Sequence, residues 1–120
     1  VFAGIWRDVP SLMAAADCFI MASRWEGLGL VFLEAMATSR PVLSTTVSAI
    51  PEVVIDGETG RLVPPDDAET MASAMVELAE SAELRSRLGT AGHARVVERF
   101  GLDVMVDDTL SVYEDVIAAS

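Results

Sequence analysis

The sequence has no lysine, one cysteine, Cys18, and one histidine, His93. A single cysteine excludes a disulfide within the chain and does not make the Cys cluster of a structural zinc site. We interpret Cys18 as a small core residue of an apolar strand, and a reducing compartment fits this usage. His93 falls in a predicted helix far along the chain, so we expect it to be structural or exposed.

Basic residues are also few. Eight Lys plus Arg stand against 19 Asp plus Glu, which gives a formal net charge of −11. Nucleic acids and anionic membranes attract Lys and Arg, so this balance argues against both as partners of this part of the protein. No apolar run approaches the roughly 20 residues that span a bilayer, and no signal-peptide start is visible. We expect a cytoplasmic location, with any peripheral membrane contact made by another part of the protein.

An initial methionine is missing as well. The chain starts at Val1, and its first residues, VFAGI, read as a core strand. We therefore expect a piece of a longer protein. Of its 120 residues, 52% are hydrophobic and 22% are charged, which is enough apolar material for one small core.

The predicted elements alternate between strands and helices in the first half of the chain. We predict strands at residues 1–5, 17–22, 41–44 and 61–64, helices at 9–16 and 30–37, one helical turn within 50–55 and a tight turn at 56–60. This alternation implies a parallel sheet with crossover helices. The predicted fold class is α/β, a partial Rossmann-like parallel sheet flanked by helices, strand-rich over 1–65 and helical over 66–120.

The second half shows helical periodicity, so the chain should end in two or three helices. The first is capped by Asp66 or Asp67, the second covers 82–100, and the last starts after Gly101. Gly89 and Gly92 predict close packing or a kink in the second helix. The expected inward residues are Ala68, Met71, Ala72, Met75, Val76 and Ala79 in the first helix, Leu84, Leu88, Ala91 and Val97 in the second, and Leu102, Met105, Val106, Leu110, Tyr113 and Ile117 in the last.

The most informative stretch is 23–34, which reads SRWEGLGLVFLE and joins a predicted strand to a predicted helix. Gly27 and Gly29 lack a Cβ, and a helix that starts at Leu30 points its free N–H groups at the same place, which suits a phosphate. Glu34, one turn into the helix, could accept hydrogen bonds from ribose hydroxyls, and Glu26 could hold a second sugar. The same residues also fit a helix cap, a solvated face and simple turns.

A longer pattern includes this stretch. The Glu-x7-Glu spacing lies in EGLGLVFLEAMA and is followed by PVLSTTVSAIPEVVIDGETGRLVPPDD. Over about residues 1–113 the chain resembles the C-terminal, nucleotide-sugar-binding half of the family 4 retaining glycosyltransferases, which have the two-domain GT-B fold. The closing segment, ERF followed by YEDVI, resembles the same family.

The resemblance implies a reaction and a set of roles. The reaction is transfer of a glycosyl group from a nucleotide sugar, such as a UDP- or GDP-sugar, to an acceptor hydroxyl with retention of configuration. Glu26, as catalytic residue, would hold the hydroxyls of the transferred sugar, and Glu34 would bind the ribose. The donor diphosphate and sugar would meet Gly27 and the backbone N–H groups of Gly29, Leu30 and Val31.

The resemblance also implies what lies outside the chain. An N-terminal domain would supply the acceptor site, and a basic pair before Val1 would neutralise the diphosphate, so we expect these 120 residues alone to be inactive. No cofactor or metal is expected. We interpret the Asp66-Asp67 and Asp107-Asp108 pairs as solvated charge.

Three further residues are candidate donor contacts. Arg24 could assist the phosphates or be a solvated loop cation, Trp25 could stack on a sugar or base or only anchor the loop, and Thr46 could face the donor. The sequence also departs from the family pattern, which often has Gly where this chain has Ser39 and Gly-Gly where it has Ser48-Ala49. The second departure lies near the expected donor.

Two other kinds of function remain open at this stage. One is a nucleotide-sugar binding module without activity. The other is a different GT-B enzyme, such as a sugar-nucleotide epimerase or a phosphorylase. A phosphorylase of the pyridoxal type needs a lysine, which this chain lacks.

Overall fold

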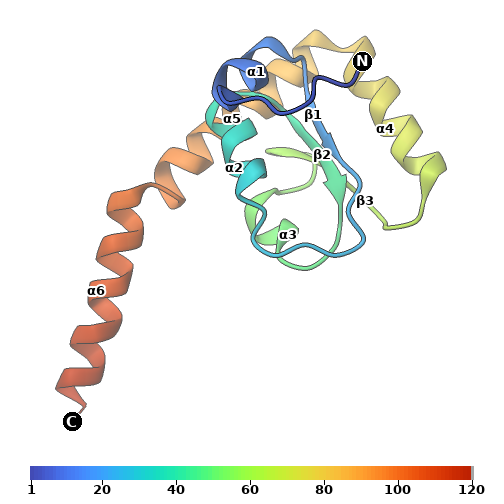
Figure 1. Ribbon diagram of the computed structural model, residues 1–120. Coiled ribbons are helices and arrows are strands. Elements are labelled where there is room, and N and C mark those ends of the chain that lie inside the picture. The colour runs from blue at the N-terminus through green and yellow to red at the C-terminus, as the bar shows by residue number, and fades with distance from the viewer. Residues whose placement is uncertain (120) are drawn as a thin grey trace.

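The computed structural model describes residues 1–119 as a parallel sheet covered by helices (Figure 1). In chain order the elements are α1 (Val9–Ala15), β1 (Phe19–Met21), α2 (Leu30–Ala37), β2 (Val42–Thr45), α3 (Ile50–Val53), β3 (Gly60–Val63), α4 (Ala68–Glu80), α5 (Ala82–Arg99) and α6 (Leu102–Ala118). The sheet order is β1-β2-β3, and both pairs of neighbouring strands are parallel. The predicted α/β class, a parallel sheet flanked by helices, is confirmed.

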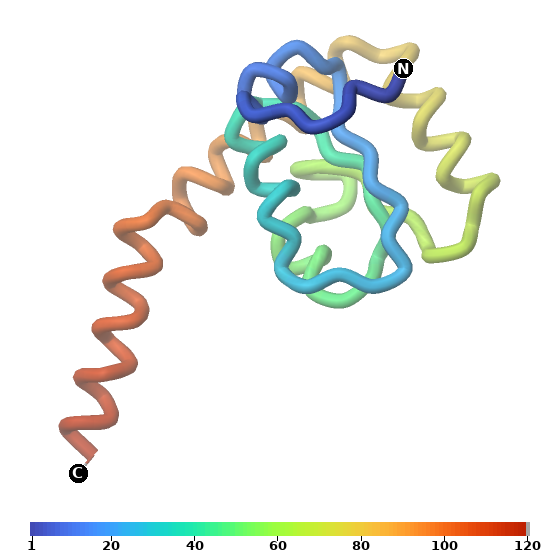
Figure 2. The backbone as a smooth tube through the Cα atoms, in the orientation of Figure 1, coloured from blue at the N-terminus to red at the C-terminus, as the bar shows by residue number. Residues whose placement is uncertain are grey.

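The middle strand, β2, is covered on both faces, and all four of its residues are buried. Val42 packs in one core with Phe32 and Met36 of α2. The next residue, Leu43, packs in a second core with Leu78 of α4. Successive side chains of a strand point to opposite faces, so α2 and α4 cover opposite faces of the sheet. Figure 2 traces these two helices on either side of the strands.

The N-terminal segment is not the strand predicted for residues 1–5. It has no regular secondary structure, and the side chains of Val1, Phe2 and Ile5 are fully exposed. A strand needs a neighbour for its backbone N–H and C=O groups. Within residues 1–119, β1 pairs with β2 only, so the sheet described has three strands instead of the four predicted.

The strand predicted over 17–22 is shorter in the structure, Phe19–Met21. Cys18 lies just before it and is half-buried, so its assignment to the core of a strand was wrong. Partial burial raises the pKa of the Cys18 thiol, the charge of Asp17 raises it further, and Arg85 opposes both. The strand is shorter because its pairing with β2 begins only at Phe19, which lies opposite Val42.

The inward face of α4 differs from the predicted one. Its buried residues are Ala74 and Leu78, with Met71 packed beside them. Of the predicted residues only Met71 lies on this face, and the others are exposed: Ala68, Ala72, Met75, Val76 and Ala79. Two stripes of the helix have apolar residues at helical spacing, and packing on β2 and β3 selects the one that contains Leu78.

The inward face of α5 is predicted more accurately. Leu88 is buried, and Leu84 and Ala91 are partly buried, as expected. Val97 was wrong, since its side chain is 63% exposed and the preceding residue, Val96, packs against the core instead. One residue along a helix turns the side chain by about 100°, which accounts for the difference.

Close packing at the two glycines of α5 is confirmed. A Cβ at Gly89 would overlap the carbonyl oxygen of Ser39, and a Cβ at Gly92 would lie 3.3 Å from the carbonyl oxygen of Thr59. The helix therefore lies directly against the turn that leads into β2.

The last helix, α6, extends away from the sheet (Figure 1). None of the residues that the structure describes in α6 is buried. Its predicted apolar side is therefore uncovered, including Leu110, whose side chain is 52% exposed. Across residues 1–119 no helix combines the length and the apolar character needed to cross a membrane.

Candidate functional site

The stretch singled out in the sequence forms the connection from β1 to α2. Residues 23–29 follow the carboxyl end of β1, residues 46–49 follow β2, and residues 64–67 follow β3. Because the strands are parallel, all three connections lie at the same edge of the sheet. Ligands of open parallel sheets bind at this edge.

Gly29 begins α2 in a conformation that favours glycine. Its φ is 64°, in the left-handed region, and it is the N-cap residue of the helix. A Cβ at this position would lie 2.5 Å from Cδ2 of Phe32, which is completely buried. Both the backbone angle and the space therefore exclude a larger residue.

The first turn of α2 faces the same loop. No side chain in the described residues caps this helix. The N–H groups of a first turn have no partner within the helix, and the helix dipole adds positive potential there. The backbone at Leu30 and Val31 can therefore donate to an anion.

Glu26 is held by three hydrogen bonds. Its carboxylate accepts from the hydroxyl of Ser23 at 3.3 Å and from the N–H of Gly27 at 3.3 Å. The N–H of Glu26 donates to the hydroxyl of Ser48 at 3.3 Å. The residue is half-buried, so its carboxylate has a defined position beside Gly29, whose missing Cβ would lie 3.3 Å from Cγ of Glu26.

Glu34 lies on the exposed side of α2. It follows Leu30 by four residues, and residues four apart occupy the same face of a helix, about one turn from each other. Its carboxylate therefore lies on the face that begins at the helix start. The structure brings Glu26, Gly27, Gly29, Leu30 and Val31 together and places Glu34 one turn along.

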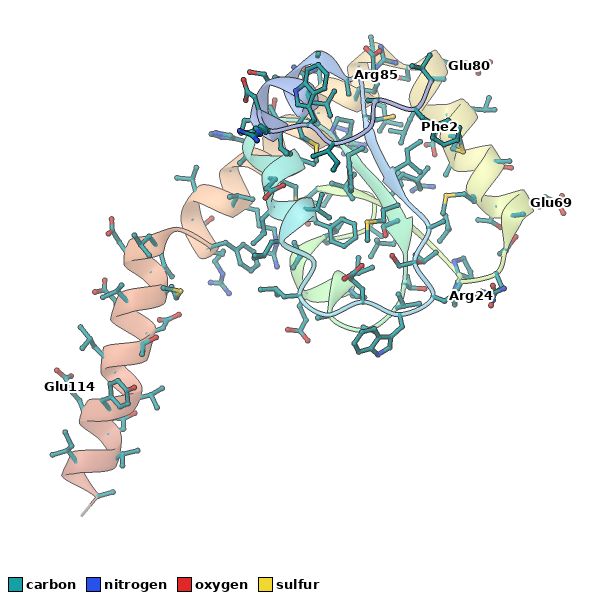
Figure 3. The ribbon with its side chains drawn as sticks, viewed as in Figure 1. Phe2, Arg24, Glu69, Glu80, Arg85 and Glu114 are labelled. Atoms are coloured by element: carbon teal, nitrogen blue, oxygen red, sulfur yellow. The ribbon has the colours of Figure 1, made fainter. Side chains whose placement is uncertain are left out.

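The remaining predicted contacts lie outside this group. Arg24 turns toward the connection before α4, where its Nε lies 2.6 Å from a carboxylate oxygen of Asp66 (Figure 3). Trp25 is 80% exposed. Thr46 bonds with the carbonyl oxygen of Val63, to which its N–H donates at 2.8 Å and its hydroxyl at 3.3 Å. The side chains of Arg24 and Thr46 thus have partners within the fold, and the side chain of Trp25 is exposed.

A hollow of about 340 Å³ adjoins the Glu26 loop and was not anticipated from the sequence. Ser23, Arg24, Thr45, Asp66 and Met71 are among its lining residues. It lies between the carboxyl ends of the strands and the start of α4. The prediction of a parallel sheet could have located it, since such a sheet collects the ends of its strands at one edge.

Ser48 was noted only as a departure from the family pattern, and the structure gives it a partner at the site. It is one of the few residues other than glycine with a positive φ, here 50°. Ser39, the other departure, has a φ of 57°. The family pattern often has glycine at both positions, and glycine there indicates left-handed backbone. This signal was present in the resemblance to the family and not in the residues of this chain.

The Asp66-Asp67 pair has an ordinary structural setting, with Asp66 bound to Arg24. Asp67 caps α4, since its carboxylate accepts from the N–H of Thr70 at 3.0 Å and from its hydroxyl at 2.7 Å. These bonds lower the pKa of Asp67. In residues 1–119 no group of three or more His, Cys, Asp and Glu side chains is arranged to hold a metal ion. His93 is exposed on α5, as expected.

The sequence is similar to those of curated glycosyltransferases. Over 113 residues the chain is 37% identical to an MMP α-(1→4)-mannosyltransferase of Mycolicibacterium hassiacum, covering 93% of this chain and 28% of that protein. It is 34% identical to an N-acetyl-α-D-glucosaminyl L-malate synthase of Bacillus anthracis, covering 98% of this chain and 31% of that protein. The chain therefore spans about a third of the length of these relatives.

Solved structures agree with the sequence comparison. The sucrose-phosphate synthase of Thermosynechococcus elongatus superposes with a TM-score of 0.82 at 34% identity, covering 91% of this chain and 27% of that one. Anabaena HepE in complex with UDP-glucose superposes with a TM-score of 0.84 at 28% identity, covering 92% of this chain and 32% of that one. The sequence model of one family, described as glycosyl transferases group 1, matches residues 1–81. With this match over most of its length, the chain belongs to the glycosyl transferases group 1 family.

Proposed function

We propose that this chain binds the nucleotide-sugar donor of a longer retaining glycosyltransferase. The observation that carries the proposal is the start of α2, where a left-handed Gly29 opens the helix between Glu26 and Glu34. A neighbour in fold, Anabaena HepE, was solved with UDP-glucose, which supports a donor of this class.

Each residue has a chemical role in this proposal. The diphosphate lies against the backbone N–H groups from Gly29 to Val31, where the helix dipole favours negative charge. Glu34 accepts hydrogen bonds from the ribose hydroxyls. Glu26 accepts from hydroxyls of the transferred sugar and stabilises the positive charge that develops on that sugar as the bond to phosphate breaks.

The rest of the reaction belongs to a part of the protein outside this chain. An N-terminal domain holds the acceptor site, and a basic pair upstream of Val1 neutralises the phosphates further. The apolar side of α6 is uncovered, and another domain of a longer protein could pack on it. This supports the assignment of this chain to a larger enzyme. Neither a cofactor nor a metal enters the proposed reaction.

Donor binding by the 120-residue chain tests the proposal. We expect UDP-glucose, GDP-mannose or ADP-glucose to shift the amide signals of Gly27, Gly29, Leu30 and Val31 in a ¹⁵N NMR titration. Without the upstream bases the affinity should be weak, and no sugar should be transferred. A titration with all three donors that leaves these amides unmoved would contradict the proposal.

Two variants separate the roles of the carboxylates. Glu34→Gln should weaken nucleotide and nucleotide sugar alike by about tenfold, the usual effect of removing a charged hydrogen-bond partner. Glu26→Gln should weaken the nucleotide sugar much more than the nucleotide. Glu80→Gln is the matched control, because Glu80 is the last residue of α4. Figure 3 shows it well away from Arg24, which belongs to the same loop as Glu26. Equal effects of all three variants would exclude the assigned roles.

A further inference from the structure

We propose that Ser48 is a positioning residue for Glu26, and that its hydroxyl holds the loop segment carrying this carboxylate in the geometry that grips the donor sugar. The inference rests on the proposed function, because it assumes the sugar-binding role of Glu26. It assigns a task to a side chain that the family pattern does not contain at this position.

The contact joins two connections at the carboxyl edge of the sheet. The N–H of Glu26, between β1 and α2, donates to Oγ of Ser48, between β2 and α3, at 3.3 Å. The two residues are 22 positions apart in sequence. A glycine at position 48 offers no acceptor there, so this bond depends on the serine side chain.

The turn that carries Ser48 is anchored on both sides. The N–H of Val47 donates to the carbonyl oxygen of Thr45 at 3.0 Å, and the N–H of Ile50 donates to the carbonyl oxygen of Val47 at 3.1 Å. Thr45 and Ile50 are both buried. Ser48 is thus presented from a fixed support, which a positioning residue requires.

A second hydroxyl from the same side of the site holds the other end of the Glu26 segment. Thr45 Oγ1 donates to the carbonyl oxygen of Ser23 at 2.5 Å, and the hydroxyl of Ser23 donates to the carboxylate of Glu26 at 3.3 Å. The segment 23–26 is therefore held at its first residue by Thr45 and at its last by Ser48. Between them, Trp25 is exposed and Arg24 contacts Asp66, so Thr45 and Ser48 fix the two ends of the segment.

The backbone of Ser48 indicates that the hydroxyl has a use. Its φ of 50° is a left-handed conformation that glycine adopts freely and serine does not. Replacing serine by glycine would remove the strain and the hydroxyl together. Strained residues of this kind cluster at functional sites, where the surrounding structure holds them in place. The bond to Glu26 is the contact that sets serine apart from glycine here.

The experiment compares Ser48→Gly with Ser48→Ala, because these variants separate the hydroxyl from the strain. Both lose the bond to Glu26, but only glycine relieves the left-handed backbone. Affinities for UDP and for UDP-glucose are measured by NMR titration of the 120-residue chain, and melting temperatures are measured without ligand. The preference for UDP-glucose over UDP should fall by about threefold to tenfold in both variants, as expected for one lost hydrogen bond. The melting temperature should rise only for Ser48→Gly.

The control is Ser73→Ala, which removes a hydroxyl whose bond is to the carbonyl oxygen of Glu69 within α4. It should leave the preference unchanged. If both Ser48 variants keep the wild-type preference while UDP-glucose still binds, the role of Ser48 is overturned and the proposed function stands. If only Ser48→Ala loses the preference, strain and not the hydroxyl is responsible, and the inference is also overturned. If none of UDP-glucose, GDP-mannose and ADP-glucose binds the wild-type chain, the proposed function fails and the inference fails with it. Where GDP-mannose or ADP-glucose binds instead of UDP-glucose, that donor and its nucleotide replace UDP-glucose and UDP in the comparison.

Discussion

Gly89 of α5 lies directly against the backbone carbonyl of Ser39, in the turn between α2 and β2. A Cβ at position 89 would overlap this oxygen. On its other side the turn is held by the N–H of Ser39, which donates to the carbonyl oxygen of Met36 at 2.9 Å. The contact between Gly89 and Ser39 therefore sets the height of α5 above the turn that leads into the middle strand.

Gly89→Ala should destabilise the protein despite its higher helix propensity. Alanine gains about 1 kcal/mol over glycine in a helix, but forcing a methyl group against a fixed carbonyl costs about 1–3 kcal/mol. We expect a net loss of about 1 kcal/mol, measured by urea unfolding followed by circular dichroism. Gly92→Ala is the control, since its Cβ would lie 3.3 Å from the nearest atom and needs only a small adjustment. Equal stability of Gly89→Ala and wild type would contradict the packing described.

Ser39→Gly should stabilise the protein. The φ of Ser39 is 57°, and left-handed backbone costs a residue other than glycine roughly 1–2 kcal/mol. Glycine offsets part of this gain through the greater entropy of its unfolded chain, about 0.4–1 kcal/mol. A net gain of about 0.5–1 kcal/mol remains. Ser73→Gly, at an ordinary helical position in α4, should lower stability in the same assay, and a parallel response of the two variants would argue against strain at Ser39.

Leu78→Ala tests which face of α4 is buried. Leu78 is completely buried, so its truncation should cost about 2–5 kcal/mol. Met75 lies on the face predicted from periodicity but is 45% exposed, and Met75→Ala should cost much less. Urea midpoints of the two variants measure the difference. The reverse order would mean that α4 is rotated about its axis relative to the structure.

The cap of α4 should make stability depend on pH in the acid range. The hydrogen bonds from the side chain and the N–H of Thr70 hold the pKa of Asp67 below its ordinary value of 3.8 in the folded state. The unfolded chain binds the proton more readily, so the stability from this group is complete above 3.8 and disappears as the pH falls through the lowered pKa. Asp8 at the start of α1 is arranged in the same way with Ser11.

Asp67→Asn isolates this contribution, because asparagine caps a helix but does not titrate. The melting temperature of the wild type should exceed that of the variant near neutral pH, and the difference should shrink as the pH falls from about 5 to about 2. A difference that stays constant over this range would show that Asp67 does not titrate with folding.

Local patterns predict the helices of this protein well. The helix expected at 30–37 has those bounds in the structure, and the cap of α4 is Asp67, one of the two residues expected. These features depend on neighbours within one or two turns. The strand expected at residues 1–5 depends on a partner far along the chain, and periodicity does not supply one. The face of α4 likewise depends on which stripe meets β2 and β3.

The residues of the candidate site also fall into two groups, those set by neighbours in sequence and those set by the packing of distant strands. Glu26, Gly29 and Glu34 could be predicted as candidates because they belong to one continuous stretch. Ser48 and Thr45 were not assigned to the Glu26 segment, because Ser48 reaches Glu26 and Thr45 reaches Ser23 only when β1 and β2 lie side by side. Their hydrogen bonds depend on the register of the sheet, which pairs Phe19 with Val42.

The two hydrogen bonds that hold the Glu26 segment also have a consequence for folding kinetics. Thr45 with Ser23 and Ser48 with Glu26 each close a loop of 22 residues, so neither forms before β1 and β2 have paired. The entropy cost of closing a loop of this length comes before the contact contributes any stability. The site should therefore form late in folding, together with the sheet. A ligand at the site would then bind only chains in which β1 and β2 have paired. Its binding would slow the unfolding of the whole sheet.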